Sequence, residues 1–427
     1  MPAYCTTRAL VPALRRGRGA PRLSLLAASR LALSAALILA CAACARPAPT
    51  TEKMSVSFLP APGELLTSAG DRLDAEGFRT RAQNATYILV GESHGNACDH
   101  LAEARVISLL SHAERKPVVG LEMAPATLNP VLAEFAAGAF PPEELEQRLD
   151  WSKNWGHPFA KYLPVFRAIR DWNLPVYGLN VPPPVIRRLS KSAQENSPAD
   201  GKDPVAALSA EDRALLPGRI IGPAPEQLAF LREVMSGHPK GRDTEDPRQV
   251  ARFQLIQSVW DSAMAEQAVR ARKATGRSVI ALAGTAHVEG GLGIARRIAV
   301  LDPGAEILLV SSWRGDAFTP ADADVRVYCP ERFESRMGMT LESRPYGEAF
   351  EYVVAEVRRE SRADVAGLRP GDVLTRAGGH RVRSLTALHL AGSDAFRDKK
   401  SLTLEVRRGR QCLSVDLGPL GVPADKK

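Results

Sequence analysis

Thr86-Tyr-Ile-Leu-Val-Gly91-Glu92-Ser93-His94 and Val279-Ile-Ala-Leu-Ala-Gly284-Thr285-Ala286-His287 have the same form, an apolar run that ends in Gly-x-x-His. Each apolar run predicts a buried strand. Each glycine allows the backbone to turn sharply as it leaves the strand. Each histidine then follows a strand end, where open α/β sheets collect their ligands. The two motifs therefore predict two imidazoles at one edge of a sheet.

The chain alternates strand-like and helix-like segments between residues 55 and 313. Further buried strands are predicted at 117–121, 175–180 and 305–312, with helical sequence between them. This alternation predicts an α/β fold with a mostly parallel sheet, covered by helices on both faces. Residues 314–334 are rich in proline and charge and predict a linker. Beyond them, short strands and turns predict a separate, small, strand-rich domain at 335–418, followed by a tail at 419–427.

Residues 1–44 predict a signal peptide with lipobox-like cysteines. Six arginines precede an apolar run, and the segment has no acidic residue. The run is too short to span a membrane well. A lipid would be attached at Cys41 or Cys44, ahead of a tether at 45–54; the alternative is plain secretion with two incidental cysteines. Without those arginines the formal net charge of +8 falls to +2, and we expect no nucleic-acid partner. The predicted location is a bacterial cell envelope, as a periplasmic or outer-membrane lipoprotein.

Three cysteines remain beyond the signal peptide, namely Cys98, Cys329 and Cys412. An odd number in an oxidising compartment leaves at least one thiol unpaired. Cys98 follows His94 by four residues, which makes a metal-ligand role conceivable. We expect instead a small, buried cysteine on the helix after the first motif.

Polar residues gather at the predicted strand ends: Glu92, His94, Glu122, Asn180 and His287. Two histidines and one or two carboxylates could hold a divalent metal ion with one position open for water or substrate. The same groups could instead serve as base and electrophile in metal-free hydrolysis. The alternative is that each residue caps the helix after its strand or binds loop amides.

Seven motifs, in this order and spacing, resemble the ChaN family of haem-binding lipoproteins, whose superfamily includes the Tiki metalloproteases and erythromycin esterases. They are Ile88-Leu-Val-Gly-Glu-Ser-His94, Gly120-Leu-Glu-Met123, Trp155-Gly156, Tyr162-Leu-Pro164, Gly178-Leu-Asn180, Gln257…Asp261…Met264 and Leu282-Ala-Gly284…His287. The resemblance covers residues 55–313. It implies a haem-binding protein of iron uptake, with haem stacked in a homodimer and iron held by a tyrosine.

Tyr162 lies in a matching segment and is the candidate haem ligand, because phenolate is a known ligand of haem iron. Trp155 is the candidate to pack on the porphyrin, and His157 neighbours it. The alternative is that Tyr162 belongs to the core stripe of one helix.

The resemblance to the Tiki proteases implies a second function. Those enzymes bind metal through two Gly-x-x-His motifs and a separate glutamate; this chain has both motifs and Glu122. In such a site Glu92 or Glu122 would polarise a metal-bound water. His100 and His112 match no family position, and we expect both to be ordinary surface or helix residues.

Residues 335–418 resemble a PDZ domain through Ser361-Arg-Ala-Asp-Val-Ala-Gly367-Leu-Arg-Pro-Gly371-Asp372-Val-Leu374. PDZ domains add a peptide to a sheet edge and hold its C-terminal carboxylate in a loop of amides. Met337, Gly338 and Met339 would form that loop, which departs from the usual Gly-Leu-Gly-Phe. The expected partner is a peptide or protein C-terminus; a purely structural PDZ domain is the alternative.

Three functions stay open on this evidence. The leading one is an envelope lipoprotein that binds haem or iron for uptake or handling and recruits a partner through its PDZ domain. The second is a metal-dependent, peptidase-like hydrolase, and the third is a non-catalytic adaptor. Whether the chain is an enzyme is left open.

Overall fold

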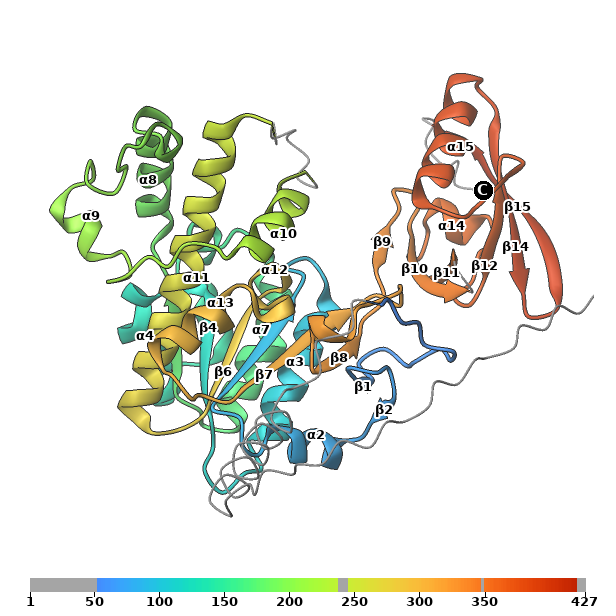
Figure 1. Ribbon diagram of the computed structural model, residues 1–427. Coiled ribbons are helices and arrows are strands. Elements are labelled where there is room, and N and C mark those ends of the chain that lie inside the picture. The colour runs from blue at the N-terminus through green and yellow to red at the C-terminus, as the bar shows by residue number, and fades with distance from the viewer. Residues whose placement is uncertain (1–51, 237–244, 347–348, 421–427) are drawn as a thin grey trace, which may run out of the picture. The chain divides into compact units, whose positions relative to one another are not determined.

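The computed structural model describes residues 52–236, 245–346 and 349–420 (Figure 1). The predicted signal peptide, with Cys41 and Cys44, lies outside these residues. In the part of the chain that is described, every helix is too short or too polar to cross a membrane.

Eight strands form the first sheet, in the order β2-β1-β8-β7-β3-β6-β4-β5. The six parallel strands are β3 (Tyr87–Glu92), β4 (Val118–Pro125), β5 (Val176–Asn180), β6 (Val279–Gly284), β7 (Ile307–Trp313) and β8 (Val325–Tyr328). Two antiparallel strands finish one edge, β1 (Leu65–Thr67) and β2 (Arg72–Leu73). The predicted α/β fold with a mostly parallel sheet is confirmed.

Helices cover both faces of this sheet, and β3 shows why. Its side chains alternate between the two faces, so that Ile88 and Val90 enter one hydrophobic cluster while Tyr87 and Leu89 enter the other. The first cluster is closed by α2 (Ala75–Ala82), α3 (Ala97–Leu110), α4 (Asn129–Ala136) and α7 (Phe159–Asp171). The second is closed by α11 (Pro247–Thr275), α12 (Thr285–Val288) and α13 (Ile294–Leu301). Strands buried on both faces are typical of parallel sheets.

Shorter helices fill the connections between these elements. They are α5 (Leu145–Arg148), α6 (Trp151–Asn154), α8 (Pro183–Glu195), α9 (Ala210–Ala214) and α10 (Pro225–Ser236). The long helix α11 has the capping residues that are typical of helix ends. Asp246 accepts a hydrogen bond from the amide of Arg248, Pro247 is the first helical residue, and Gly276 ends the helix in a left-handed conformation.

The predicted linker at 314–334 differs from the structure. Its residues include β8, which pairs with β7 and β1 inside the first sheet, and β9 (Arg332–Glu334), which belongs to the second sheet. β8 is a buried run of four residues between prolines and charges, so its own pattern is too short to stand out.

The second sheet is antiparallel and strand-rich, as predicted for the C-terminal region. Its order is β15-β14-β12-β11-β10-β9, and β13 pairs with β12. Its strands are β9, β10 (Met339–Tyr346), β11 (Ala349–Val357), β12 (Val373–Ala377), β13 (His380–Arg381), β14 (Ser401–Arg408) and β15 (Gln411–Pro419). Helices α14 (Arg362–Val365) and α15 (Leu385–Arg397) complete a hydrophobic core of its own.

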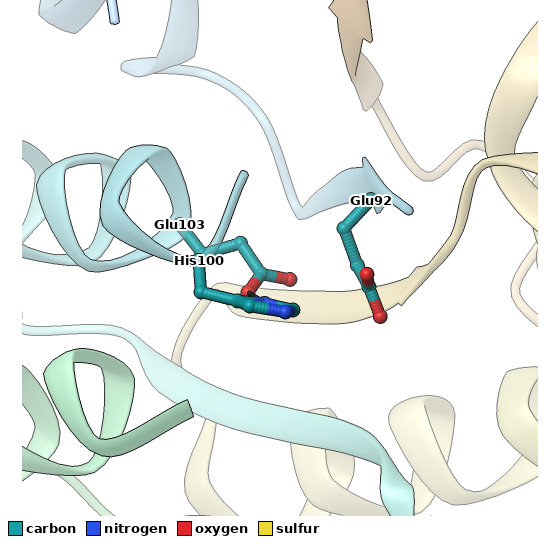
Figure 2. Close-up of side chains that lie close together, drawn as sticks. All are labelled: Glu92, His100 and Glu103. Carbon is teal, nitrogen blue, oxygen red and sulfur yellow. Dashed lines mark hydrogen bonds and ion pairs between the residues drawn. The ribbon is translucent and has the colours of Figure 1, made fainter. Parts of the chain in front are cut away.

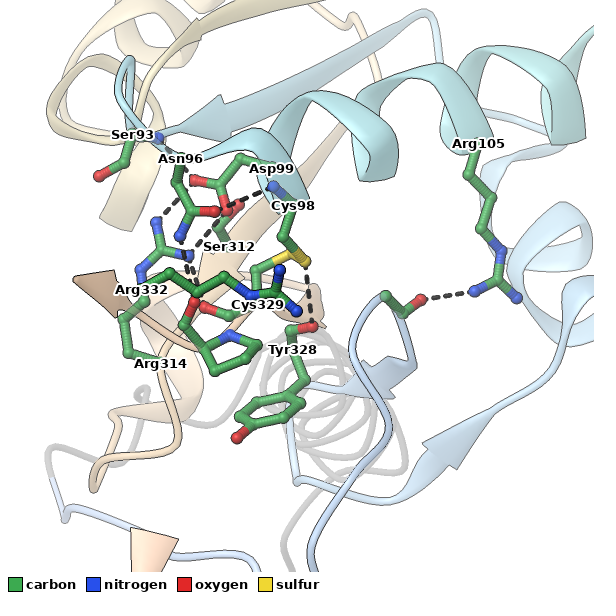
Figure 3. The surroundings of a disulfide bond; sticks show 12 residues. Ser93, Asn96, Cys98, Asp99, Arg105, Ser312, Arg314, Tyr328, Cys329 and Arg332 are labelled. Carbon is green, nitrogen blue, oxygen red and sulfur yellow. Dashed lines mark hydrogen bonds and ion pairs between the residues drawn. A yellow bond between two sulfur atoms is a disulfide. The ribbon is translucent and has the colours of Figure 1, made fainter. Parts of the chain in front are cut away.

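A disulfide joins Cys98, at the start of α3, to Cys329, just after β8 (Figure 3). The expected cysteine on the helix after the first motif is present, but Cys98 is half-buried rather than buried, and the disulfide leaves no thiol available to a metal. Among the residues that the structure describes, the unpaired cysteine is Cys412, which is exposed. The sequence could not show the pair because 231 residues separate the two cysteines and only the sheet order brings them together.

Candidate functional site

The two Gly-x-x-His motifs meet at one edge of the sheet because β3 and β6 are neighbours. Their parallel register pairs Gly91 with Ala283 and Glu92 with Gly284, so His94 and His287 leave the sheet at the same level. Glu122, on the neighbouring β4, comes to the same place. One of its carboxylate oxygens accepts the amide of Gly284 at 2.6 Å, and the other lies 3.6 Å from Nε2 of His287. Strand order thus brings His94, His287 and Glu122 to the same edge of the sheet.

His94 is the member of this group that faces solvent. Its Nδ1 lies 2.6 Å from Oε1 of the buried Glu92, and its side chain is 34% exposed. The ring rests against Gly284, where an added Cβ would come within 2.9 Å of Cε1. Burial lowers the pKa of His94, but the hydrogen bond to Glu92 and the charges of Glu122 and Glu92 outweigh it, so that its pKa is raised.

His287 is buried and held by a carboxylate that the sequence analysis did not select. Its Nδ1 lies 2.6 Å from Oδ1 of Asp261 on α11, and the other oxygen of Asp261 bonds Gln227 and pairs with Arg297. Burial lowers the pKa of His287, yet the charges of Glu122 and Asp261 and the hydrogen bond to Asp261 raise it to about 9. Asp261 appeared only within the family motif; a carboxylate on a buried helix face was the available signal.

Asn180 has a structural role. Its Nδ2 donates to the carbonyl oxygen of Glu122 at 3.2 Å, and its Oδ1 accepts the amide of Val181 at 2.8 Å. The donor and the acceptor of its side-chain amide therefore both bind backbone groups, which matches the alternative of a polar residue that binds loop amides.

The four predicted metal ligands do not form one compact group as the side chains lie. Within the described residues, a different set meets that condition: one ligand atom each from Glu92, His100 and Glu103, all within 4.8 Å of one another (Figure 2). Glu92 is common to both sets. The prediction of a site at His94, His287, Glu92 and Glu122 stays a prediction, with Glu122 and His287 adjacent and His94 across Gly284.

His100 is not the ordinary surface or helix residue that we expected. It is fully buried on α3, its ring centroid lies 3.9 Å from that of Tyr162, and its Nδ1 is 3.0 Å from Oε2 of Glu103. Burial raises the pKa of Glu103 to about 7, although the hydrogen bond from His100 lowers it. Their three-residue spacing on one helix face was the missed signal.

Aromatic and imidazole rings surround His94 on its open side. The ring of Trp155 meets it edge-on at 4.6 Å between centroids, and the ring of His157 lies 5.1 Å from it. Both residues are half-buried. Burial and the positive charges of His94, His100 and Lys161 lower the pKa of His157, which favours its neutral imidazole. We call His94, Trp155 and His157 the imidazole face.

Tyr162 lies beneath this face and is buried. Its hydroxyl donates to the carbonyl oxygen of His94 at 3.2 Å and lies 3.5 Å from Oε1 of Glu92. Burial and the charge of Glu92 raise its pKa above the ordinary value. Its packing against Trp151 in the core matches the alternative that we gave for it. Iron ligation by Tyr162 stays a prediction, and it requires the hydroxyl to leave these oxygens.

Comparison with known proteins gives the family. Residues 78–298, about half of the chain, match the family model described as haem-binding uptake, Tiki superfamily, ChaN. The chain belongs to the ChaN family. Residues 335–418 match the PDZ domain model, as predicted. Among curated proteins, no match was found.

Solved structures similar to this ChaN-family chain include ChaN of Campylobacter jejuni, described as binding haem cofacially. It is 19% identical, with 62% of this chain and 95% of that one covered, and a TM-score of 0.49. A variant of the erythromycin esterase EreC in its open conformation is 16% identical, with 73% and 89% covered and a TM-score of 0.36.

In the PDZ domain of this ChaN-family protein, β9 covers part of the edge of β10, the strand that follows the predicted carboxylate loop. The outer edge of β10 is paired with β9, which aligns Glu334 with Thr340 and Arg332 with Glu342. The predicted carboxylate loop, with Met337, Gly338 and Met339, forms the turn between these strands. Ser335 takes up the loop amides: its Oγ accepts from Met337 at 3.1 Å and its carbonyl oxygen from Gly338 at 2.9 Å.

Gly338 is required by this turn. Its φ is +88°, and an added Cβ would lie 2.1 Å from Cβ of Ser361. The glycine therefore packs the turn against α14 and supplies a left-handed conformation that other residues rarely adopt.

Proposed function

We propose that this protein is a cell-envelope lipoprotein that binds haem on its α/β domain, for haem or iron uptake or handling. The observation that carries the proposal is the imidazole face, in a chain of the haem-binding ChaN family. His94 is the solvent-facing group there, and Trp155 and His157 flank it. Histidine is a common ligand of haem iron, and indole offers a flat apolar contact for a porphyrin.

The residues of this face fit haem better than Tyr162 does as it lies. Glu92 holds Nδ1 of His94, so Nε2 is the nitrogen left to bind iron. The lowered pKa of His157 favours the neutral form, in which an imidazole ligates metal. Tyr162 is buried with a raised pKa, the opposite of an accessible phenolate.

The finer parts of the proposal follow from the domain content. The PDZ domain would recruit a peptide or protein C-terminus, which must first displace β9 from the edge of β10. A lipid at Cys41 or Cys44 would hold the protein at a membrane, and a homodimer would stack the haems of two copies. The disulfide between Cys98 and Cys329 supports an oxidising compartment, where such bonds persist.

A hemin titration followed by the Soret band tests the proposal. We expect the wild-type protein to shift the band, and His94→Ala and His157→Ala each to weaken binding at least tenfold. His112→Ala is the matched control, because exposed His112, in the turn just after α3, meets Trp172 edge-on at the same 4.6 Å between ring centroids. An unchanged Soret band with the wild-type protein would overturn the proposal.

A second candidate function is metal-dependent hydrolysis. The observation that favours it is the arrangement of Asp261, His287 and Glu122, since a ligating histidine typically gives its other nitrogen to a carboxylate. His94, His287 and Glu122 would hold the metal ion, which would supply an activated water, with Glu92 in reach of His94. Elemental analysis of His94→Ala, His287→Ala should then show a divalent ion lost; a wild-type protein that neither carries nor binds such an ion would exclude this candidate.

A further inference from the structure

Three polar side chains are buried together beneath the end of β3, directly under the imidazole face, where Glu92 contacts His94. Glu92, His100 and Glu103 have exposed fractions of 2%, 0% and 1%. Glu92 comes from the strand end, while His100 and Glu103 lie on one face of α3 and point toward it (Figure 2). Ligand atoms from all three lie within 4.8 Å of one another.

Two carboxylate oxygens in this cluster lack any partner. Glu92 uses Oε1 for His94 and leaves Oε2 unbonded, and Glu103 uses Oε2 for His100 and leaves Oε1 unbonded. Both free oxygens are buried. Buried polar atoms almost always find a partner, so an unpartnered one calls for a bound water or ion. Here there are two, on the two glutamates of one cluster.

Both ring nitrogens of His100 face oxygen atoms. Nδ1 faces Oε2 of Glu103 at 3.0 Å, and Nε2 faces the carbonyl oxygen of His94 at 3.4 Å. A neutral imidazole carries one N–H, so one nitrogen would present a lone pair to an oxygen lone pair. A cation bound between His100 and Glu103 removes that conflict.

The partners of the two buried glutamates are histidines rather than lysine or arginine. In the described part of the chain, no lysine or arginine forms an ion pair with Glu92 or Glu103. The nearby Arg314 is committed to Asp99, which it binds with both NH groups at 2.6–2.7 Å (Figure 3). Two buried carboxylates therefore have only imidazoles to balance them, and buried charge is costly unless it is paired.

We propose that Glu92, His100 and Glu103 bind a divalent transition-metal ion, held by one imidazole nitrogen and the two free carboxylate oxygens. Mixed nitrogen and oxygen ligands suit zinc, manganese or ferrous iron. Ligand atoms around a tetrahedral zinc lie roughly 3.4 Å apart, so a small contraction of the cluster closes the site. The ion would also fix Glu92, and through it the orientation of His94. The site goes beyond the haem function and does not depend on it.

Metal analysis of the full chain, purified without chelators or haem, tests this site. We expect about one divalent ion per chain, and one Co²⁺ or Zn²⁺ taken up again after stripping with a chelator. Glu103→Gln keeps the shape of the side chain and removes an anionic ligand, so it should weaken uptake at least tenfold. His287→Gln is the matched control: it alters the other predicted metal site and should leave this ion in place.

Folding of each variant is checked by near-ultraviolet circular dichroism, and His100→Asn provides a second ligand variant if Glu103→Gln does not fold. Loss of the ion in His287→Gln but not in Glu103→Gln or His100→Asn would overturn the proposal. So would a wild-type protein that neither carries nor takes up a divalent ion, because a proton would then hold the cluster together.

Discussion

Individual side chains at the sheet edge are placed by a few close contacts. Gly284 touches His94 on one side and gives its amide to Glu122 on the other, so one residue links the two strand-end groups. Asp261, on α11, holds Nδ1 of His287. The chemistry of the edge therefore depends on these two supporting residues as much as on the histidines.

Gly284→Ala should displace the ring of His94, because its Cβ would lie 2.9 Å from Cε1. His94 is partly exposed and has room to move, so we expect hemin affinity to fall several-fold while stability changes by about 1 kcal/mol or less. Hemin titration and thermal unfolding measure the two effects. Gly95→Ala is the control, because nothing lies within 4 Å of an added Cβ there; equal effects of the two substitutions would contradict the contact.

The raised pKa of His287 links stability to pH. A group whose folded pKa of about 9 exceeds its unfolded value near 6.5 stabilises the fold fully below pH 6.5, and this contribution is lost as pH rises toward 9. The contribution amounts to a few kcal/mol. Asp261→Asn should flatten that decline, and His112→Ala should not. Denaturant unfolding between pH 6 and 9.5 measures it; parallel curves for wild type and Asp261→Asn would refute the linkage.

At the scale of elements, the loop that carries His94 is held at its far end. Ser93 donates its amide to Asp99 at 2.7 Å, Arg314 binds Asp99, and the disulfide ties α3 to the residue after β8 (Figure 3). The first contact joins this loop to α3, and the other two join α3 to the residues that follow β7 and β8. Together they fix the start of α3, from which His100 and Glu103 project.

Removing the disulfide should destabilise the α/β domain. A bond that closes a loop of 231 residues lowers the entropy of the unfolded chain. In the chain-entropy model this raises the free energy of unfolding by on the order of 5 kcal/mol. We expect Cys98→Ser, Cys329→Ser to unfold at a clearly lower temperature than the wild type under oxidising conditions. Cys412→Ser is the control because Cys412 is exposed and unpaired. Identical melting of the double variant and the wild type would rule this role out.

Strand β9 should limit peptide binding by the PDZ domain. Phe333 is the central residue of β9, pairs with Leu341 and packs near Tyr352. Phe333→Ala weakens that packing, so a library of C-terminal peptides should yield tighter binders for the variant than for the wild type, by about tenfold. Tyr346→Ala, at an exposed position on β10 beyond β9, is the control. Equal binding by the wild type and Phe333→Ala would show that β9 is no obstacle.

Across the whole molecule, the features that could be predicted from the sequence are those that depend on a local pattern of residues. The apolar runs before Gly91 and Gly284 predict two strands, and the class of sheet then predicts that His94 and His287 meet. Family motifs and the PDZ turn at Gly371 supplied the domain content. These features depend on neighbours in the chain or on general rules of parallel sheets.

Features that depend on partners far apart in the chain could not be predicted. Asp261 lies on α11, 26 residues before His287 in the sequence, and Cys329 reaches Cys98 only through the sheet order. Strand β8 is buried by β7 and β1 rather than marked by its own composition. The orientation of Tyr162, toward the oxygens of Glu92 and His94, is set by packing that no spacing encodes.

The iron ligand is the central question for the molecule, and the absorption spectrum of the hemin complex addresses it most directly. Tyr162→Phe should keep the Soret shift and bind hemin within about threefold of the wild type, because the hydroxyl is buried. The double variant His94→Ala, His157→Ala should lose the shift. If Tyr162→Phe no longer bound hemin while the double variant still did, Tyr162 would be the iron ligand, and the claim that the imidazole face binds haem would be contradicted.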